Sequence, residues 1–313
     1  MANAATPVPI TPEDEEEAHK LYIKNLGESI NSKEEDSSSL KPLLKKVADQ
    51  HQACLIAFIA PITTKRVSPS ESRGAVIRQW EELGIEEAIS QIKKTVLKFD
   101  LLPKRLFFLV NSPGGSPSSS YIIANMLRNT FDDIKVFVPG LAASGGTLLA
   151  LAGNEIIMSQ ISKLTPIDTQ VVYKGEIVSA QSMRRALVTY DAYFEKKLPR
   201  EVPYPRKSMA EKFDPILFEE WEAELNQIAF YATKLLKKAG YPANIVNKLA
   251  FNLIFSPFPH GFVIDRERAK YFELNIKNSE AYRDVWEILK SWYSLYVLKA
   301  EDKHIIRYVL PNV

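Results

Sequence analysis

The sequence predicts an α/β fold, with a mainly parallel sheet and flanking helices, because short apolar runs alternate with longer stretches of helical periodicity. The apolar runs have the length of strands and contain few polar residues, which is typical of strands buried on both faces. A chain of 313 residues is long enough to bury a large core around such a sheet. The predicted strands are ACLIAFIA (53–60), RLFFLVN (105–111), IKVFVP (134–139) and NEIIMS (154–159).

Helical periodicity fills the intervals between the first three strands. GIEEAISQIKKTVLKF (84–99) and SYIIANMLRNTF (120–131) place apolar side chains three and four residues apart. Farther along, residues 215–240 predict a long amphipathic helix, with Pro215 in its first turn and Gly240 as its C-cap. The last residues, 285–311, predict a helix and then a strand.

Three regions follow from these patterns. Residues 1–47 are expected to form an acidic helical arm and a polar linker, because Thr11 and Pro12 precede five acidic residues; a disordered tail is the alternative. Residues 48–280 are expected to form the main domain, with a helical insertion at about 196–250. Residues 281–313 are expected to contact another subunit, because their aromatic side chains would be sticky if exposed: Trp286, Trp292, Tyr293 and Tyr296.

The composition excludes several classes of protein. The N-terminus lacks the basic and apolar regions of a signal peptide, and no run reaches the roughly 18 apolar residues of a membrane helix. We therefore expect a cytoplasmic protein with no direct membrane insertion. The lone cysteine, Cys54, cannot form an internal disulfide, and its apolar surroundings predict a buried structural role.

The charge distribution and the spacing of possible metal ligands indicate which partners and cofactors to expect. A net charge of +2 gives no general reason to expect a nucleic-acid partner. The basic run from Arg184 to Lys207 is expected to be a solvated face, with a polyanion site as the alternative. Histidine, cysteine and carboxylate residues nowhere have metal-ligand spacing, so neither a metal nor another cofactor is expected.

Glycines mark the candidate site. Each of five glycines follows a predicted strand and precedes a predicted helix, where backbone N–H groups can face a ligand without an intervening side chain. Turns of this kind are where active sites are built in parallel α/β sheets. These glycines are Gly114, Gly115, Gly140, Gly145 and Gly146.

Ser144 stands at the start of a short apolar helix in VPGLAASGGTLLALAG (138–153). A nucleophilic serine here would have the N–H of Gly145 beside it and a helix dipole directed at a developing oxyanion. The alternative is that Ser144 only caps the helix.

The two turns together, NSPGG (111–115) and AASGG (142–146), strongly resemble those of ClpP-type serine peptidases and of the signal peptide peptidase A group. The segments GNEIIMSQISKLTPIDTQ (153–170) and FPHGFVIDRERAKYFELNI (258–276) resemble the serine dehydrogenase proteinase family. The resemblance implies a ClpP/crotonase-like fold and a serine peptidase with Ser144 as the nucleophile. It also implies oxyanion donors from Gly114 or Gly115 and from Gly145. The absence of G-x-S-x-G disfavours an α/β-hydrolase.

The general base is not in its usual place. The ClpP-type pattern implies a histidine about twenty-five residues after the serine, where SKLTPIDTQ has none, and the signal peptide peptidase pattern implies a lysine where Arg184 and Arg185 stand. Asp168 lies where that histidine would fall, and His260 lies in the segment that runs near the acidic member of the ClpP triad. An exchanged triad of Ser144, His260 and Asp168 is therefore one hypothesis.

The other hypothesis for the base is a serine–lysine dyad with Lys174 or Lys163, if burial lowers the pKa of the amine. Each candidate also has a simpler interpretation. His260 would be an ordinary loop histidine, Asp168 would cap a turn, and the lysines would be solvated. His304 gives a weaker signal, because it lies near the terminus.

Three functions remain open from the sequence. The first is hydrolysis of peptides or unfolded proteins, and the second is a non-catalytic assembly subunit that has lost its base. The third, an acyl-CoA enzyme of crotonase type, ranks lowest because that chemistry does not require a serine hydroxyl. The resemblance also implies a homo-oligomer that encloses the site.

Overall fold

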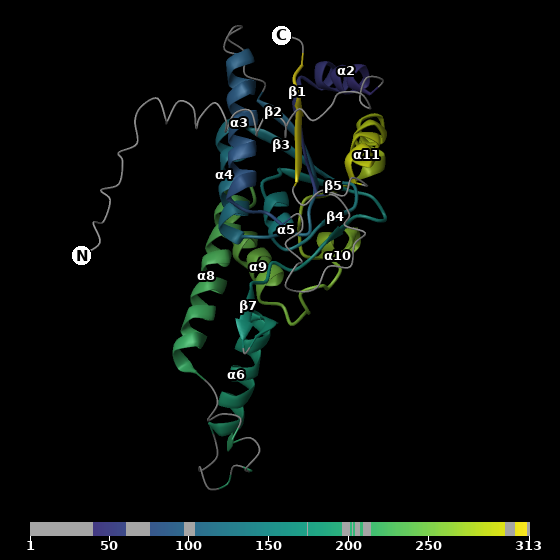
Figure 1. The fold of residues 1–313 in the computed structure, drawn as a ribbon. Helices are drawn as coiled ribbons and strands as arrows, with labels where there is room; N and C mark the ends of the chain where they lie inside the picture. Colours follow the sequence, from purple (N-terminus) through teal and green to yellow (C-terminus); the bar gives the residue numbers. More distant parts are fainter. Residues whose placement is uncertain are drawn as a thin grey trace, which may run out of the picture.

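The computed structural model describes residues 40–60, 76–96, 104–173, 175–195, 201, 203, 207–208, 214–297 and 304–311. Within these residues, six strands form the central sheet in the order β10-β1-β2-β3-β5-β9 (Figure 1). All neighbouring pairs are parallel except β10, which is antiparallel to β1. The strands are β1 (Ala53–Ile59), β2 (Arg105–Asn111), β3 (Asp133–Val138), β5 (Glu155–Met158), β9 (Ile276–Asn278) and β10 (Ile305–Val309).

Helices cover both faces of the sheet, so alternate residues of each strand enter different halves of the core. In β1, Ile56 and Phe58 pack in one cluster, while Leu55 and Ala57 pack in the other. Figure 1 shows α3 and α4 on one side of the sheet and α2 and α11 on the other. The first side holds α3 (Gln79–Val96), α4 (Pro117–Thr130), α5 (Gly145–Ala150), α8 (Pro215–Lys238), α9 (Ala243–Ile254) and α10 (Arg266–Tyr271), and the second holds α2 (Lys41–His51) and α11 (Arg283–Val297).

The predicted α/β class and its parallel sheet are confirmed. The four predicted strands correspond to β1, β2, β3 and β5, and the first two predicted helices correspond to α3 and α4. Pro215 begins α8, and Gly240 follows its C-cap with a positive φ of 88°. Elements too short to show periodicity were not predicted: β4 (Leu141–Ala142), β6 (Lys163–Leu164), β7 (Gln170–Tyr173), β8 (Glu176–Ser179), β9 and the 3₁₀ helix η3 (Ser279–Tyr282).

The expected boundary at residue 47 falls inside α2. Leu44, Val47 and Ala48 are buried against the sheet, so residues 41–47 pack with the core rather than in an arm outside it. Burying the apolar face of α2 against the sheet is more favourable than exposing it to water, so the helix packs on the core. The predicted acidic helix at residues 11–17 lies outside the described residues.

The aromatic side chains of the C-terminal segment are also largely buried in the protein's own core. Trp286, Trp292 and Tyr296 of α11 are buried against the second face of the sheet, and Tyr293 is partly buried beside them. Their apolar area is covered within the chain by β1, β2 and β3, so these side chains are not the exposed aromatic surface on which the expected subunit contact of residues 281–313 was based; the contact itself stays a prediction. Strand β10 completes the segment by pairing with β1.

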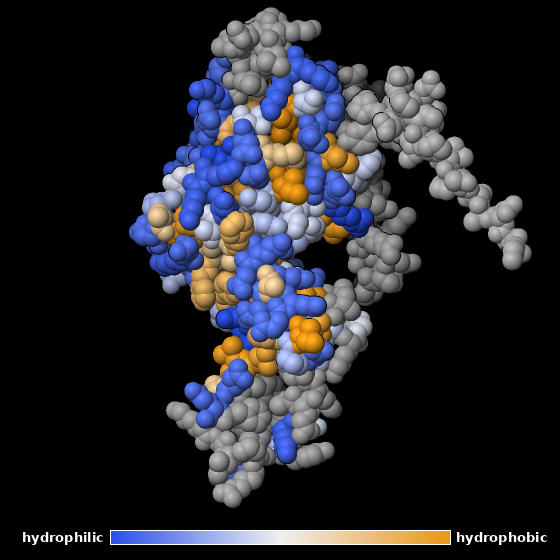
Figure 2. All heavy atoms as spheres, turned by 90° about the vertical axis from the view of Figure 1, so that its left-hand side faces the viewer, coloured by the Kyte–Doolittle hydropathy of each residue, from blue (hydrophilic) through white to orange (hydrophobic). Residues whose placement is uncertain are grey.

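Helices α6 (Ala180–Phe194) and α8 extend together away from the sheet (Figure 1). Arg184 Nε lies 2.6 Å from Glu222 Oε1 and ties the two helices together, while Tyr173 packs edge-on against Trp221 near their base. Figure 2 views the side of the molecule that carries α3, α4 and α8, where orange apolar groups are scattered among blue polar ones. No helix in the described ranges has the length and apolar character needed to cross a membrane.

Replacing Trp292 by alanine is expected to lower the free energy of unfolding by about 3–5 kcal/mol, because it opens a cavity in the core. The side chain is only 2% exposed. The matched control is Tyr271→Ala, whose side chain is 81% exposed and whose effect is expected to stay within about 0.5 kcal/mol. Urea unfolding followed by circular dichroism measures both. Unchanged stability in Trp292→Ala would contradict the burial of α11.

Candidate active site

Two turns meet at the carboxyl ends of the adjacent parallel strands β2 and β3. The first covers residues 112–116 and the second covers residues 139–144. Asn111 joins them, because its side-chain N–H donates to Ala60 O at 3.0 Å and its Oδ1 accepts from Leu141 N–H at 3.0 Å. Ser112 N–H donates to Leu141 O, and Ala143 N–H donates to Ser112 O. The sheet therefore fixes the spacing of the two turns.

Glycine is required where the turns touch. Gly114 and Gly115 have φ values of 102° and 147°, which L-residues with side chains rarely adopt. A Cβ on Gly114 would lie 2.6 Å from Ala143 O, and one on Gly115 would lie 2.2 Å from Ile77 N. A Cβ on Gly145 would lie 2.5 Å from Ser120 Oγ. The backbone of one turn thus lies directly against the backbone of the other.

Ser144 holds a strained backbone conformation at the centre of this contact. Its φ of 49° and ψ of −112° lie outside the ordinary regions for a serine. Its N–H donates to Thr165 Oγ1 at 2.8 Å. Ser144 occupies the N-cap position of α5, but its side chain makes no capping hydrogen bond, so capping does not explain why a serine stands here. Strain of this kind is typical of functional positions.

Two backbone N–H groups beside Ser144 have no acceptor among the residues that the structure describes. Gly145 is the first residue of α5, so its amide has no intrahelical acceptor. In the part of the chain that the structure describes, no hydrogen bond uses the Gly115 amide. The position of a Cβ on Gly145 would be 3.1 Å from Gly115 N, so the two amides are neighbours. By contrast, the Gly114 N–H donates to Ser112 Oγ at 3.1 Å.

A cavity of about 350 Å³ opens in front of Ser144 and brings it together with Asp168 and His260. Asp168 follows β6, and His260 lies in the loop between α9 and α10. His260 Nδ1 lies 3.9 Å from Asp168 Oδ2. The carboxylate side chain is 4% exposed, whereas the imidazole is 29% exposed. The cavity is lined by Val76, Pro113, Gly115, Ser116, Pro117, Ser144, Asp168, Thr169, Gln170 and His260.

Asp168 is held by the start of α6. Its Oδ1 accepts from Gln181 N–H at 3.3 Å, so this oxygen is bound to the first turn of α6 and not to the turn that contains Asp168. Its Oδ2 has no hydrogen-bond partner in the described residues and is the atom nearest His260. Burial raises the pKa of Asp168, although hydrogen bonds and the nearby positive charges oppose the rise. A buried carboxyl with one free oxygen facing an imidazole is typical of a histidine-orienting group.

The lysine candidates are not part of this arrangement as described. Lys163 is exposed on β6 and does not line the cavity. Lys174 lies outside the described residues. Arg184 pairs with Glu222, and Arg185 Nη2 donates to Ser182 Oγ at 3.1 Å. Cys54 is buried in β1, where burial raises the pKa of its thiol to about 12 and leaves it protonated and unreactive.

Sequence reasoning missed two features of the site. Thr165, which receives the Ser144 N–H, lies in the SKLTPIDTQ segment, but its spacing gave no sign of that contact. His304 received little weight because it is near the terminus, yet it is buried and lies 2.9 Å from Ser112 Oγ. Both contacts join segments far apart in the sequence, so only the tertiary structure shows them.

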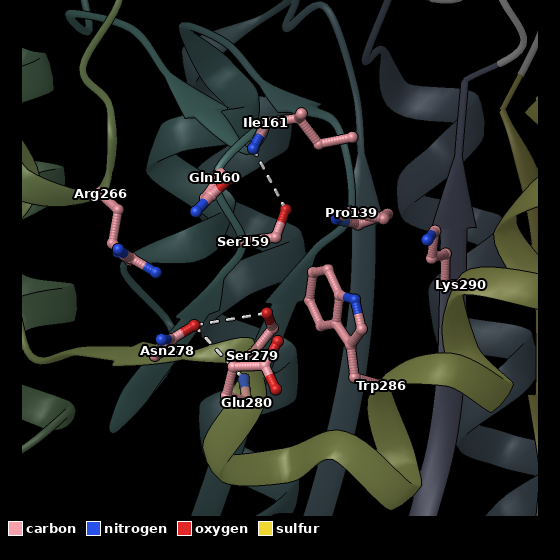
Figure 3. Close-up of a pocket in the computed structure, with 10 residues that line it drawn as sticks. All are labelled: Pro139, Ser159, Gln160, Ile161, Arg266, Asn278, Ser279, Glu280, Trp286 and Lys290. Carbon is pink, nitrogen blue, oxygen red and sulfur yellow. Dashed lines mark hydrogen bonds between the residues drawn. The ribbon is translucent and has the colours of Figure 1, made fainter.

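A second cavity, of about 380 Å³, lies beside the carboxyl ends of β3, β5 and β9 (Figure 3). Its polar side chains are largely engaged with their own loops. Ser159 Oγ accepts from Ile161 N–H, and Asn278 Oδ1 accepts from the Glu280 N–H. Among the described residues that line it, none is a histidine, a cysteine or an aspartate. Unlike the cavity in front of Ser144, it does not bring a serine together with a histidine and an aspartate among the described residues.

A model of the ClpP-like SDH-type serine proteinase family matches residues 86–312, which is more than two thirds of the chain. The chain belongs to this family of serine peptidases, and the family predicted from its turns is confirmed. The match begins after β1 and includes both glycine turns, Asp168 and His260.

Particular relatives are more distant. Uncharacterized protein MJ0137 of Methanocaldococcus jannaschii is 28% identical over 176 residues, which cover 55% of this chain and 54% of the relative. Uncharacterized protein MJ1495 of the same organism is 26% identical over 182 residues, covering 58% of this chain and 55% of the relative. The chain thus spans about half the length of the curated relatives that it matches.

Among solved structures, a serine-to-alanine mutant of the 1510-N membrane-bound stomatin-specific protease is similar with a TM-score of 0.42 and 16% identity. The match covers 75% of this chain and 83% of that chain.

Replacing Asp168 by asparagine is expected to change the pH dependence of stability. The pKa of Asp168 is raised by burial, so the folded protein binds this proton more tightly than the unfolded chain does. Its contribution to stability is therefore present at low pH and is lost as the pH rises through the folded-state pKa. The free energy of unfolding of Asp168→Asn, relative to the natural protein, should be higher at pH 8 than at pH 4 in urea titrations. An equal difference at both pH values would contradict a buried, proton-holding Asp168.

Proposed function

We propose that this protein hydrolyses peptide bonds through an acyl-enzyme, with Ser144 as nucleophile, His260 as general base and Asp168 as the group that orients the histidine. The observation that supports this most directly is the single cavity that contains all three side chains. A triad is defined by geometry and not by chain order, so the order Ser144, Asp168, His260 is no obstacle.

In the proposed first step, Ser144 Oγ attacks the carbonyl carbon of the peptide bond and passes its proton to His260 Nε2. His260 Nδ1–H faces Asp168 Oδ2, whose negative charge stabilises the imidazolium that forms. Their 3.9 Å separation is longer than a hydrogen bond; contacts of this kind tighten when substrate closes the site. His260 then gives the proton to the leaving amine, and the acyl group stays on Ser144. A water molecule reverses these roles and releases the acid.

The proposed oxyanion donors are the amides of Gly115 and Gly145. Gly114 and Gly115 were equal alternatives from the sequence, and the hydrogen bond from the Gly114 amide to Ser112 Oγ favours Gly115. Free N–H groups aimed at the developing negative charge stabilise the transition state more than the ground state. The dipole of α5 acts in the same direction, because Ser144 stands at its N-terminal end.

The substrate class we propose is a peptide or an unfolded protein segment, handled by a cytoplasmic homo-oligomer. The cavity lies between the turn that contains Pro113, Gly115 and Ser116 and the segment of residues 168–170, an arrangement that can take an extended peptide. Exposed apolar side chains on α3, α4 and α8, such as Trp80, Ile122 and Phe230, offer surface for contacts between subunits.

A second candidate function is a non-catalytic assembly subunit that binds peptides without turnover. The observation that favours it is the long His260–Asp168 contact, together with the absence of a histidine at the ClpP-type position and of a lysine at the signal peptide peptidase position. A hydroxyl without a working base remains a poor nucleophile.

A fluorophosphonate probe is expected to label the natural protein and not Ser144→Ala, because the reagent reacts only with an activated serine. Mass spectrometry of the labelled peptide identifies the serine. Ser159→Ala, in the second cavity, is the matched control and should label normally. Equal labelling of Ser144→Ala would exclude Ser144, and no labelling of the natural protein between about pH 6 and pH 10 would favour the non-catalytic subunit.

His260→Ala is expected to lower kcat by about 10²–10⁴-fold with little change in KM, because the loss of a general base affects the chemical step. Added imidazole should restore part of the rate. His51→Ala, at the end of α2, is the matched control and should keep the full rate. A normal rate in His260→Ala together with a loss in Lys174→Met would move the base to Lys174.

A further inference from the structure

A second histidine, His304, lies in the core beside Ser112, at the start of the turn that contains Gly114 and Gly115. His304 immediately precedes β10 and its side chain is fully buried. Its ring stacks on Phe58 with 4.3 Å between the ring centroids. His304 Nε2 lies 2.9 Å from Ser112 Oγ, and Nδ1 lies 3.5 Å from Glu81 Oε1. Glu81 is also buried. A carboxylate, an imidazole and a hydroxyl therefore form one line through the core.

The Glu81 carboxylate determines which ring nitrogen of His304 carries the proton. A carboxylate accepts hydrogen bonds only, so the ring nitrogen that faces Glu81 must carry the proton. Burial of the ring lowers the pKa of His304, so the imidazole is neutral near pH 7 and has one N–H. Nδ1–H then faces Glu81 while Nε2 accepts from the Ser112 hydroxyl. Ser112 Oγ keeps its lone pairs for the Gly114 N–H, 3.1 Å away.

The Glu81 carboxylate also binds the backbone just after Ile77, the residue that pairs with the Gly114–Gly115 turn. Glu81 Oε2 accepts from Arg78 N–H at 2.8 Å, which closes the first turn of α3. One residue earlier, Ile77 N–H donates to Gly114 O, and Ile77 O accepts from Ser116 N–H. Both polar groups of the Gly114 backbone are thus occupied, by Ser112 and by Ile77. The adjacent Gly115 lines the cavity, and its amide makes no hydrogen bond to any residue in the described ranges.

We infer that Glu81, His304 and Ser112 form a buried positioning relay that fixes the Gly114–Gly115 turn, so that the Gly115 amide is held in place for the oxyanion. This inference rests on the proposed function, since it assigns a role to groups that never touch the substrate. Ser112 is fully buried and lies behind the turn, so it is no second nucleophile. The relay acts through the backbone of the turn, and its effect falls on the transition state in which the oxyanion exists.

The first test measures whether the relay holds the turn, and it needs no enzymatic activity. Hydrogen–deuterium exchange of the peptide covering residues 110–117 is compared for the natural protein, Ser112→Ala and His304→Phe. The phenylalanine keeps an aromatic ring beside Phe58 but removes the imidazole nitrogen that accepts from the Ser112 hydroxyl. Exchange in this peptide is expected to rise at least tenfold, while exchange in β1 and β2 stays unchanged. Unchanged exchange in the turn would overturn the inference.

The second test measures whether the turn's position matters for catalysis. In Ser112→Ala and His304→Phe, kcat is expected to fall and Ki for a peptide aldehyde to rise, each about tenfold to a hundredfold. KM should stay within about twofold. The aldehyde forms a hemiacetal with Ser144, whose oxygen occupies the oxyanion position. His304→Gln can still accept from Ser112, so it should recover part of the rate lost in His304→Phe.

Tyr282→Phe is the matched control. It removes a hydrogen bond to Glu155 on the far side of the sheet, and it should leave kcat and Ki unchanged. If the turn loosens but kcat and Ki do not move in an active enzyme, the positioning role is wrong. If the natural protein shows no Ser144-dependent labelling, the proposed function fails by itself, and the exchange experiment still decides whether the relay holds the turn.

Discussion

The contact between the Gly114–Gly115 turn and the Ser144 turn determines most of the local structure around the site. The two backbones approach so closely that a Cβ on Gly114 would lie 2.9 Å from the Ser144 Cβ. Close approach places the amides of Gly115 and Gly145 next to each other, and Gly115 lines the cavity. It also forces Ser144 into a positive φ, a conformation that costs on the order of 1–3 kcal/mol for a residue with a side chain.

The surrounding structure supplies what is needed to hold this strained arrangement. Thr147 Oγ1 lies 2.7 Å from Ala142 O and 2.8 Å from Thr165 O, and Thr165 Oγ1 accepts from the Ser144 N–H. These contacts connect α5 to the segment that carries Asp168. Beneath them, the parallel pairing of β2 with β3 fixes the spacing of the two turns. The rigid sheet therefore makes the strain tolerable, and a loop without such support would relax out of it.

The fold was largely predictable because its strongest signals are local. An apolar strand such as β2, and a periodic helix such as α4, carry their own patterns of seven or more residues. The short strand β9 could not be predicted in this way, because three residues show no period. The sequence also did not show that the tryptophans of α11 pack on the chain's own sheet, since an amphipathic helix has the same pattern whether it packs there or on another subunit.

In the candidate site too, the features with a local sequence pattern were predictable and those that depend on distant contacts were not. The sequence by itself determined the two glycine turns and the serine in the second of them, because only glycine tolerates those φ values and that closeness of backbones. Only the tertiary structure decided what surrounds Ser144. Asp168 and His260 are separated by more than ninety residues, and His304 and Ser112 by 192. Contacts between side chains so far apart in the sequence depend on how the sheet and its helices pack, and residue spacing alone does not predict that packing.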